Sequence, residues 1–366
     1  MSRRRVVITG VGPVAPNGTG KEPFWDALVA GRSGISAVKG FDATVFPCQV
    51  AGQVDDFDTE PYIEARHARR MARFSQLAVV AARLAEADSG LDAIPGAEAA
   101  RRGVCLGVSQ NALDLLERGF EQFMKQGGRK ASPLLAGAAF PHAAAAEIAI
   151  ACGCQGPVST ISAGCASGAS AVGSAYEEIR AGRADVMYTG GADGSVTPFA
   201  LAAMCAARML PRTEEGEDPA QVSRPFDGSR RGGVYAEGAG VVVLESLDHA
   251  VSRRARIYGE IVGYGANAEA HAMIEFAGDD SFLERSMRVA LAAGRLLTTD
   301  VDYISAHGPS DGCDLQETRA IKAVFGAHAY NLAISSIKSM IGNPLSAAGP
   351  LQLISAALAL ERQKVP

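Results

Sequence analysis

Short runs of β-branched residues alternate with alanine-rich stretches along most of the chain. Most of these runs are apolar over several consecutive positions rather than at every second one, which is typical of strands that are covered on both faces of a sheet. Only a short polar segment joins the last two runs before residue 270, so we expect these to be neighbouring, antiparallel strands. The expected strands are residues 5–9, 103–108, 158–161, 185–189, 241–245, 257–264 and 303–306.

Stretches with helical character lie between these strands. They cover residues 21–30, 69–88, 143–151, 166–181, 282–293 and 314–325. The alternation predicts an α/β fold in which helices cover both faces of mixed or parallel sheets. Residues 212–233 are the most loop-like part, and no low-complexity linker divides the chain. We therefore expect its parts to pack as one body.

Length and composition exclude several classes of function. At about 150 residues per domain, 366 residues correspond to two domains or one duplicated unit. The net charge of −5 and the 6% aromatic content argue against nucleic acid as a partner. No apolar run reaches the roughly 18 residues of a membrane span, and the apolar stretch after the basic start is too short for a signal peptide. We expect a cytoplasmic protein that does not contact a membrane.

The cysteines indicate reduced thiols rather than a disulfide framework, because they are few and odd in number. Cys152 and Cys154 have no second Cys or His pair at ligand spacing, so we expect no metal site. The glycines at 10–12 and 18–20 lack the remaining features of nucleotide-binding loops, so we also expect no nucleotide. The cysteines are Cys48, Cys105, Cys152, Cys154, Cys165, Cys205 and Cys313.

The most informative segment is residues 158–168, VSTISAGCASG. An expected strand runs into a turn of small residues, and an expected helix starts directly after Cys165. Unpaired N–H groups and the dipole at a helix N-terminus favour a thiolate over a thiol. Cys165 is therefore a candidate nucleophile, and the structural alternative is a small buried core thiol.

Six segments in the same order resemble the elongating β-ketoacyl-acyl-carrier-protein synthases, condensing enzymes of fatty-acid and polyketide synthesis in the thiolase superfamily. They are VVITGVGPVAPNG, TISAGCASGASAV, ADVMYTGGADG, SRPFDGSRRGGVYAEGAGVVVLE, DYISAHGPSDGCDLQETRAIKAVFG and SSIKSMIGNPLSAAGP, and together they reach from residue 6 to residue 350.

This resemblance implies a thiolase-like, five-layered α-β-α-β-α fold of two duplicated halves. The N-terminal half, residues 1–250, would carry the nucleophile, and the C-terminal half, residues 251–366, its partners. The resemblance also implies an acyl carrier protein as partner and a tight dimer, either with a second copy or with a paralogous ketosynthase subunit. It implies no resident cofactor, since the phosphopantetheine arm arrives on the carrier protein.

The resemblance assigns roles to individual residues. Cys165 would carry the acyl group as a thioester, and His307 would bind the malonyl thioester carbonyl and support decarboxylation. Lys338 would order the site, with Glu317 in the same network. Taken singly, these last three have structural alternatives: a satisfied core histidine, a surface cation and a solvated helix residue.

The sequence departs from the family pattern around the nucleophile's partners. Asn343 replaces the second histidine, which gives a Cys-His-Asn set similar to that of the initiating (type III) condensing enzymes. An amide can donate an N–H but cannot carry a proton. The family's His-Gly-Thr-Ser-Thr is changed after His307 to Gly-Pro-Ser-Asp. Pro309 and Ser310 thus occupy positions that bind the phosphopantetheine arm, where Pro309 offers no donor and the carboxylate of Asp311 would repel a phosphate.

Further positions carry weaker expectations. The family's Arg-Asp-Gly-Phe becomes Arg-Arg-Gly-Gly at 230–233, and Gln352 stands where a glutamate is common. His271 matches a position at the substrate entrance, with a surface histidine as the alternative. Arg69, Arg70 and Arg73 could face an acidic carrier protein, with a solvated face as the alternative.

Family members continue for some tens of residues beyond the position of Pro366. That segment carries a Gly-Phe-Gly-Gly loop with the second oxyanion donor, so we expect the C-terminal half, residues 251–366, to be incomplete. Removing one oxyanion donor typically costs about 10²–10³ in rate.

Three functions remain open from the sequence. The first is a condensing enzyme that forms a Cys165 thioester and joins it to malonyl carrier protein with loss of CO₂. The second is a non-catalytic partner subunit resembling a chain-length factor, suggested by the altered residues. The third is an acyltransferase on the same fold that does not decarboxylate.

Overall fold

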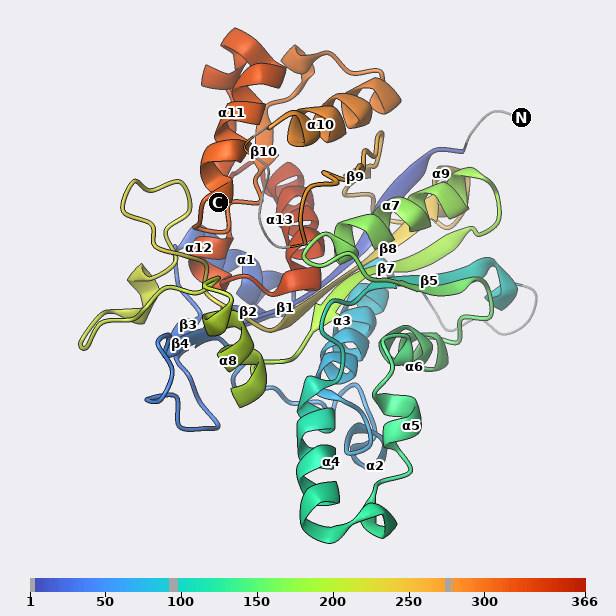
Figure 1. Ribbon diagram of the computed structural model, residues 1–366. Coiled ribbons are helices and arrows are strands. Elements are labelled where there is room, and N and C mark those ends of the chain that lie inside the picture. Colours follow the sequence, from blue (N-terminus) through green and yellow to red (C-terminus); the bar gives the residue numbers. More distant parts are fainter. Residues whose placement is uncertain (1–3, 92–97, 274–277, 279) are drawn as a thin grey trace.

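A mixed β-sheet crosses the centre of the protein (Figure 1). The computed structural model describes residues 4–91, 98–273, 278 and 280–366. In the large sheet the strands follow the order β2-β1-β8-β7-β5-β6, with β9 beside β1. Strand β8 runs antiparallel to β1 and β7, whereas β5 runs parallel to β7 and β6. The strands are β1 (Val6–Ala15), β2 (Gly18–Thr19), β3 (Ile35–Ala37), β4 (Val50–Gly52), β5 (Arg102–Gly107), β6 (Val158–Ile161), β7 (Val186–Asp193), β8 (Gly238–Ser246), β9 (Gly259–Glu260), β10 (Tyr303–Ser305) and β11 (Ala333–Ser335).

Helices separate and cover the sheets. They are α1 (Lys21–Val29), α2 (Ala65–Ala68), α3 (Arg73–Ser89), α4 (Leu113–Gln126), α5 (Leu135–Ala138), α6 (Ala143–Ala151), α7 (Ser167–Arg180), α8 (Pro198–Ala206), α9 (Leu247–Ser252), α10 (Ser281–Gly294), α11 (Cys313–Phe325), α12 (Lys338–Ile341) and α13 (Ala348–Arg362). Among the described residues, no helix is long and apolar enough to cross a membrane.

The helices and sheets stack in five layers (Figure 1). Helices α3 and α6 pack on one face of the large sheet, and α7 and α13 pack on the other. Beyond α13 lies the parallel pair β10–β11, and α10 and α11 form the outermost layer. The thiolase-like fold is confirmed. Because α13 from the C-terminal half covers a sheet of the N-terminal half, the two halves pack as one body.

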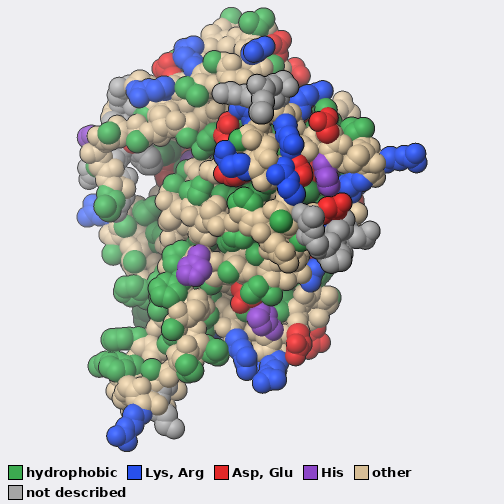
Figure 2. All heavy atoms as spheres, turned by 90° about the vertical axis from the view of Figure 1, so that its right-hand side faces the viewer, with side chains coloured by type: hydrophobic (Ala, Val, Ile, Leu, Met, Phe, Trp, Pro, Cys, Tyr) green, Lys and Arg blue, Asp and Glu red, His purple; other side chains and the backbone are tan. Residues whose placement is uncertain are grey.

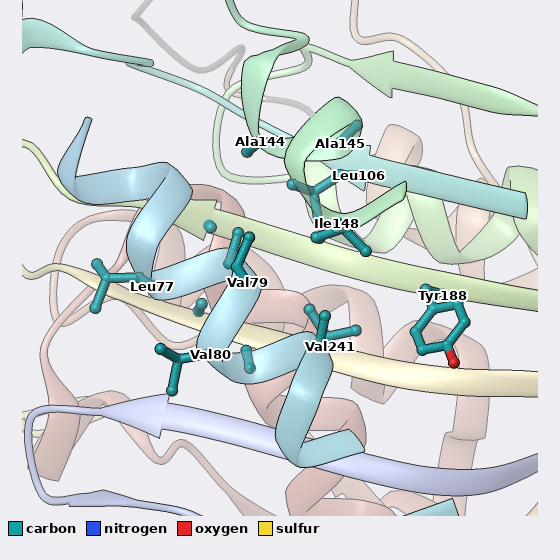
Figure 3. Packing of buried hydrophobic residues seen from close by; sticks show 14 of the residues in the cluster. Leu77, Val79, Val80, Leu106, Ala144, Ala145, Ile148, Tyr188 and Val241 are labelled. Atoms are coloured by element: carbon teal, nitrogen blue, oxygen red, sulfur yellow. The ribbon is translucent and has the colours of Figure 1, made fainter. Parts of the chain in front are cut away.

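Small and aliphatic side chains fill the core between α3, α6 and the large sheet (Figure 3). Helix α3 presents alanine, leucine and valine to the strands, and Leu77 and Val80 are fully buried. On β1 the facing residue is Gly12, where an added Cβ would lie 1.9 Å from the carbonyl oxygen of Ala81. A side chain at this position would push the helix off the sheet.

Two expectations about elements are wrong. Residues 69–88 do not form one helix, because Ala72 is extended (φ −70°, ψ 156°) and α3 begins only at Arg73. The segments at 241–245 and 257–264 are not neighbours, because β1 lies between them and pairs with both β8 and β9. The second segment contains only the two-residue strand β9.

Helices α4 and α5 project from the body at the bottom of Figure 1, and we did not expect either from the sequence. Their projecting region carries many hydrophobic side chains on the face shown in Figure 2. None of the residues of α4 is buried. Exposed large apolar residues on and around these helices are Leu116, Phe120, Phe123, Met124, Leu134 and Phe140.

Candidate active site

A cavity of about 1010 Å³ lies between the two halves and collects most of the expected site residues. Those that line it are Cys165, His307, Pro309, Glu317 and Asn343. Lys338 is buried behind this wall, and Ser310 is completely buried. His271 is exposed and is not part of the wall, although its neighbours Ala272 and Met273 are.

The turn between β6 and α7 holds Cys165 at the cavity. Gly164 adopts φ 57°, which favours glycine, and the helix starts at Ser167. The Ser167 hydroxyl accepts a hydrogen bond from the Ala163 N–H (2.8 Å) and donates one to the Gly164 carbonyl (2.5 Å), so it closes the turn. On the other side, the Asn343 amide Nδ2 donates to the Cys165 sulfur at 3.7 Å.

The electrostatics around Cys165 differ from the expectation based on the helix terminus. Burial raises the pKa of the Cys165 thiol, and the positive charge of Lys338 and the hydrogen bond from Asn343 lower it only in part. The charge of Asp193 raises this pKa further. The expected preference for a thiolate is therefore wrong for the unliganded site, because burial outweighs the stabilising groups.

Lys338 and His307 form a close pair. The Lys338 Nζ donates to the His307 carbonyl at 2.6 Å and lies 3.4 Å from the ring nitrogen Nδ1. Lys338 is only 1% exposed, so the alternative of a surface cation is wrong. Burial lowers the pKa of Lys338 to about 8. Burial and the neighbouring Lys338 charge lower the pKa of His307 to about 3.

These values define the state of the histidine near neutral pH. His307 is neutral and Lys338 is mostly charged, so Nδ1 faces a cation that can only donate. Nδ1 therefore acts as acceptor, and the ring proton resides on Nε2. A neutral imidazole with an N–H at Nε2 can donate a hydrogen bond within the cavity that it lines.

Glu317 fixes the backbone of the same histidine. Its two carboxylate oxygens accept the N–H groups of His307 and Gly308, each at 2.8 Å. Glu317 is 8% exposed, so the alternative of a solvated helix residue is wrong. Burial raises the pKa of Glu317, and these two hydrogen bonds and the Lys338 charge oppose the rise.

The residues expected to meet the phosphopantetheine arm divide into two groups. Pro309 and Asp311 line the cavity, and burial raises the pKa of the Asp311 carboxyl. Ser310 instead has a structural role, because its hydroxyl accepts the Arg224 N–H at 2.8 Å and its own N–H donates to Asp314. Direct binding by the Ser310 side chain is not supported by this geometry.

The structure also places Gln352 and Arg73, for which the expectations from the sequence are weaker. Gln352 lines the cavity and donates to the Ser305 carbonyl at 3.1 Å. Arg73 does not face outward for a carrier protein, because its guanidinium donates to Glu237 and to the Val54 carbonyl. Within the described parts of the chain, no group of three or more His, Cys, Asp or Glu residues could hold a metal ion.

Two residues near the nucleophile were not expected to belong to the site. Cys313 at the start of α11 is a second thiol in the cavity wall. Asp193 is a buried carboxylate at the end of β7 whose charge acts on Cys165. The available signal for Asp193 was its place directly after an apolar strand, where an acidic residue is unusual without a partner.

The chain matches known families over nearly its whole length. Residues 3–250 match the β-ketoacyl synthase N-terminal domain and residues 258–366 match the C-terminal domain. The granaticin polyketide β-ketoacyl synthase 1 of Streptomyces violaceoruber is 41% identical over 99% of this chain and 87% of that protein. The 3-oxoacyl-[acyl-carrier-protein] synthase 2 of a Synechocystis strain is 36% identical over 100% of this chain and 88% of that protein.

Solved structures agree with this assignment. One, described as a type II polyketide synthase acyl-carrier protein in complex with its ketosynthase bound to the hexaketide, superposes with a TM-score of 0.90 at 33% identity. The match covers 100% of this chain and 88% of that chain. The ishigamide ketosynthase/chain length factor superposes with a TM-score of 0.88, also at 33% identity, over 99% and 87% of the two chains. The cavity, the five layers and the sequence matches agree, and the chain belongs to the β-ketoacyl synthase family of condensing enzymes.

Proposed function

We propose that this protein catalyses the decarboxylative condensation of an acyl group on Cys165 with malonyl carrier protein, and is thus an acyltransferase. The observation that carries the proposal is the shared cavity, in which the Cys165 thiol, the Asn343 amide and a neutral His307 face the same space. A nucleophile and two uncharged N–H donors are what thioester chemistry with a developing oxyanion requires.

The first half-reaction is transfer of the acyl group. The Cys165 sulfur attacks the carbonyl of an acyl thioester on the carrier protein, the Cys165 S–H proton passes to the departing thiolate, and the carrier leaves as its free thiol. Because burial keeps Cys165 as a thiol in the free enzyme, this proton has to leave during the attack. The Lys338 charge and the Asn343 N–H favour the transient thiolate.

The second half-reaction is condensation. The malonyl carboxylate leaves as CO₂, and its bonding electrons form an enolate on the thioester oxygen. The Nε2–H of His307 and the Asn343 amide N–H would donate to that oxygen as negative charge develops. The enolate carbon then attacks the acyl carbonyl on Cys165, the C–S bond breaks, and the β-ketoacyl product stays on the carrier protein. The Cys165 thiolate regains a proton from solvent.

The partners follow from the relatives and from the surface. A related ketosynthase has been solved with its acyl carrier protein, and another with a chain length factor. We propose that this chain likewise receives substrates on a carrier protein's phosphopantetheine arm, with no resident cofactor, and forms a dimer with a second copy or a paralogous subunit. The exposed apolar residues around α4 and α5 offer a surface for such a subunit. The seven cysteines are all free, in keeping with a cytoplasmic location.

The alternatives are less well supported. The relatives named above are synthases, and Cys165 remains in the cavity with hydrogen-bonding partners. In a non-catalytic partner subunit or a non-decarboxylating acyltransferase, the close pair of His307 and Lys338 would have no chemical role.

Intact-protein mass after incubation with an acyl-loaded carrier protein tests the proposal. We expect a mass increase equal to the acyl group, absent in Cys165→Ala and retained in Cys313→Ala, which removes the other thiol of the same cavity. Malonyl carrier protein should then yield a β-ketoacyl carrier protein. A folded protein that never gains the acyl mass, or gains it equally in Cys165→Ala, would refute the proposal.

A further inference from the structure

Asp193 is a fully buried carboxylate close to Cys165 that takes no part in the proposed chemistry. It ends strand β7 and is 1% exposed. One oxygen, Oδ1, accepts the N–H groups of Ser109 (3.3 Å) and Gln110 (2.8 Å). The other, Oδ2, accepts the N–H (2.9 Å) and the hydroxyl (2.5 Å) of Ser346. Burying a carboxylate is costly, so four donors on one group indicate a specific purpose.

Ser346 belongs to the turn that carries Asn343. Leu345, which starts the 3₁₀ helix Leu345–Ala347, has φ 47°, a strained conformation for a side-chain-bearing residue. The two hydrogen bonds from the next residue to Asp193 hold the strained turn in place. The Ser346 carbonyl also lies against Gly168 and Gly191, where an added Cβ would come within 2.1 Å and 2.2 Å of its oxygen. Gly168 is three residues after Cys165, so this turn also packs against the start of the nucleophile helix.

A second connection reaches Asn343 through Gln110. The Tyr235 hydroxyl donates to the Gln110 side chain and to the Ser195 carbonyl, the latter at 3.0 Å. On either side of Tyr235, the Val234 carbonyl accepts the Asn343 N–H at 2.7 Å and the Ala236 N–H donates to the Asn343 carbonyl at 3.2 Å. Asp193 therefore fixes both segments that flank Asn343, one directly and one through Gln110 and Tyr235.

Asp193 also acts on the nucleophile through its charge. Its negative charge raises the pKa of Cys165, opposing Lys338, which lowers it. The other titratable groups in this region are Tyr235, which interacts with Asp193 and Cys165, and Glu237 and Glu117, which interact with Tyr235. Of these, Glu237 forms an ion pair with the Arg73 guanidinium.

We propose that Asp193 is a positioning residue that holds the Asn343–Ser346 turn against the nucleophile helix and tunes the Cys165 thiol. This inference rests on the proposed function, because it assigns Asn343 and Cys165 to one reaction. Losing the carboxylate should have two separable effects. The Asn343 amide is displaced from its hydrogen-bonding position, and the loss of the negative charge makes the Cys165 thiol ionise more easily.

The test measures the rate of Cys165 alkylation by iodoacetamide against pH, which needs no substrate and no carrier protein. Cys313→Ala serves as the background, so that only one cavity thiol remains. The effect of charge on the thiol is read in an Asn343→Ala background, where the amide donor cannot offset it, and there Asp193→Asn should move the alkylation midpoint to lower pH. With Asn343 present, Asp193→Asn should lower kcat for condensation about tenfold or more, because a displaced donor is costly. Ser346→Ala, which keeps the charge and removes one donor, should lower kcat by a smaller factor and, in the Asn343→Ala background, leave the midpoint unchanged.

Asp88→Asn is the matched control. Asp88 is a partly buried carboxylate that, like Asp193, accepts a backbone N–H, that of Val11, but it has no contact with the site. This variant should lose stability without moving the alkylation midpoint. An unmoved midpoint in the folded Asp193→Asn, Asn343→Ala protein would overturn the inference, as would full kcat in Asp193→Asn with Asn343 present. If the wild-type protein alkylates at Cys165 but never condenses, the proposed function fails while the effect on the thiol can still be read.

Discussion

The two walls of the cavity are built on different principles. The wall from the N-terminal half carries Cys165 on a turn of small residues, and the negative charge of Asp193 behind it disfavours the thiolate. The opposite wall carries His307 with its buried cation Lys338 and the carboxylate Glu317. Cys165 and His307 are both half-buried, and this burial keeps the nucleophile protonated on one side and the histidine unprotonated on the other.

This difference separates the tasks of the two halves. A neutral thiol is stable between turnovers and becomes a nucleophile only when a thioester arrives. A neutral imidazole can donate a hydrogen bond to a thioester oxygen, and burial together with the positive charge of Lys338 keeps His307 neutral. The charge of Lys338 acts on both groups, but their other neighbours differ, so substitutions of those neighbours should affect one half-reaction more than the other.

The largest effect is expected for Lys338→Met. Loss of the cation removes a hydrogen bond to the His307 carbonyl and a charge that lowers the pKa values of Cys165 and His307. We expect kcat for condensation to fall about 100-fold or more, as for loss of a transition-state charge stabiliser. Lys322→Met, at an exposed position of α11, should leave kcat unchanged; equal losses in both variants would contradict this role.

The next effect concerns Glu317→Gln. One of the two N–H groups of His307 and Gly308 would then face an amide NH₂ instead of an oxygen. A buried unsatisfied donor costs about 1–3 kcal/mol, which should appear in denaturant unfolding. The exposed Glu121→Gln is the control and should change little; a Glu317→Gln protein as stable as the wild type would show that these two bonds do not hold the loop.

The walls should also respond differently to acid. The pKa of His307 is lowered from about 6.5 to about 3, so between these values the unfolded chain binds a proton that the folded protein does not. Stability therefore falls as pH drops from 6.5 towards 3. The pKa of Asp193 is raised to about 6, so between 3.8 and 6 the folded protein binds the extra proton, and stability from this group falls as pH rises. The measurement is the free energy of unfolding across this pH range. His307→Gln should remove the loss of stability towards low pH, and Asp193→Asn should remove the loss of stability as pH rises from 3.8 to 6. Unchanged slopes would disprove the assignment.

The smallest effect is expected on the acylation step in Asn343→Ala. The contact from its amide to the Cys165 sulfur is long, at 3.7 Å, so its loss should slow acylation by less than tenfold. The pH midpoint of Cys165 alkylation should rise, because a donor to the thiolate is lost. A midpoint that stays unchanged would mean that Asn343 acts only on the malonyl oxygen.

The sequence predicted where individual helices and strands lie better than it predicted which strands pair with each other. The helix at 143–151 and the strand at 158–161 have the expected bounds, because an alanine-rich stretch determines the first locally and a run with β-branched residues determines the second. Strand β1 extends to Ala15, beyond the expected end at residue 9. Gly10 and Gly12 do not end the strand; they allow it to pack closely under α3. That β1 intervenes between β8 and β9 depends on long-range pairing, which a short connecting segment does not reveal.

The candidate site shows the same limit. Cys165, His307 and Asn343 meet in one cavity as the resemblance implies. Their protonation states follow from burial, which only the fold determines, and the thiolate expected from the helix terminus is therefore wrong. Asp193 was missed for a related reason, since its four donors come from two segments that are both distant from it along the chain.

The most direct test separates the two half-reactions in two variants. Acyl loading is followed by intact-protein mass, and CO₂ release from malonyl carrier protein is followed in the same preparations. We predict that Cys165→Ala loses acyl loading, whereas His307→Ala still gains the acyl mass but releases no CO₂ from malonyl carrier protein. A His307→Ala protein that releases CO₂ at the wild-type rate, or one that is folded and cannot be acylated, would contradict the division of labour between the two walls.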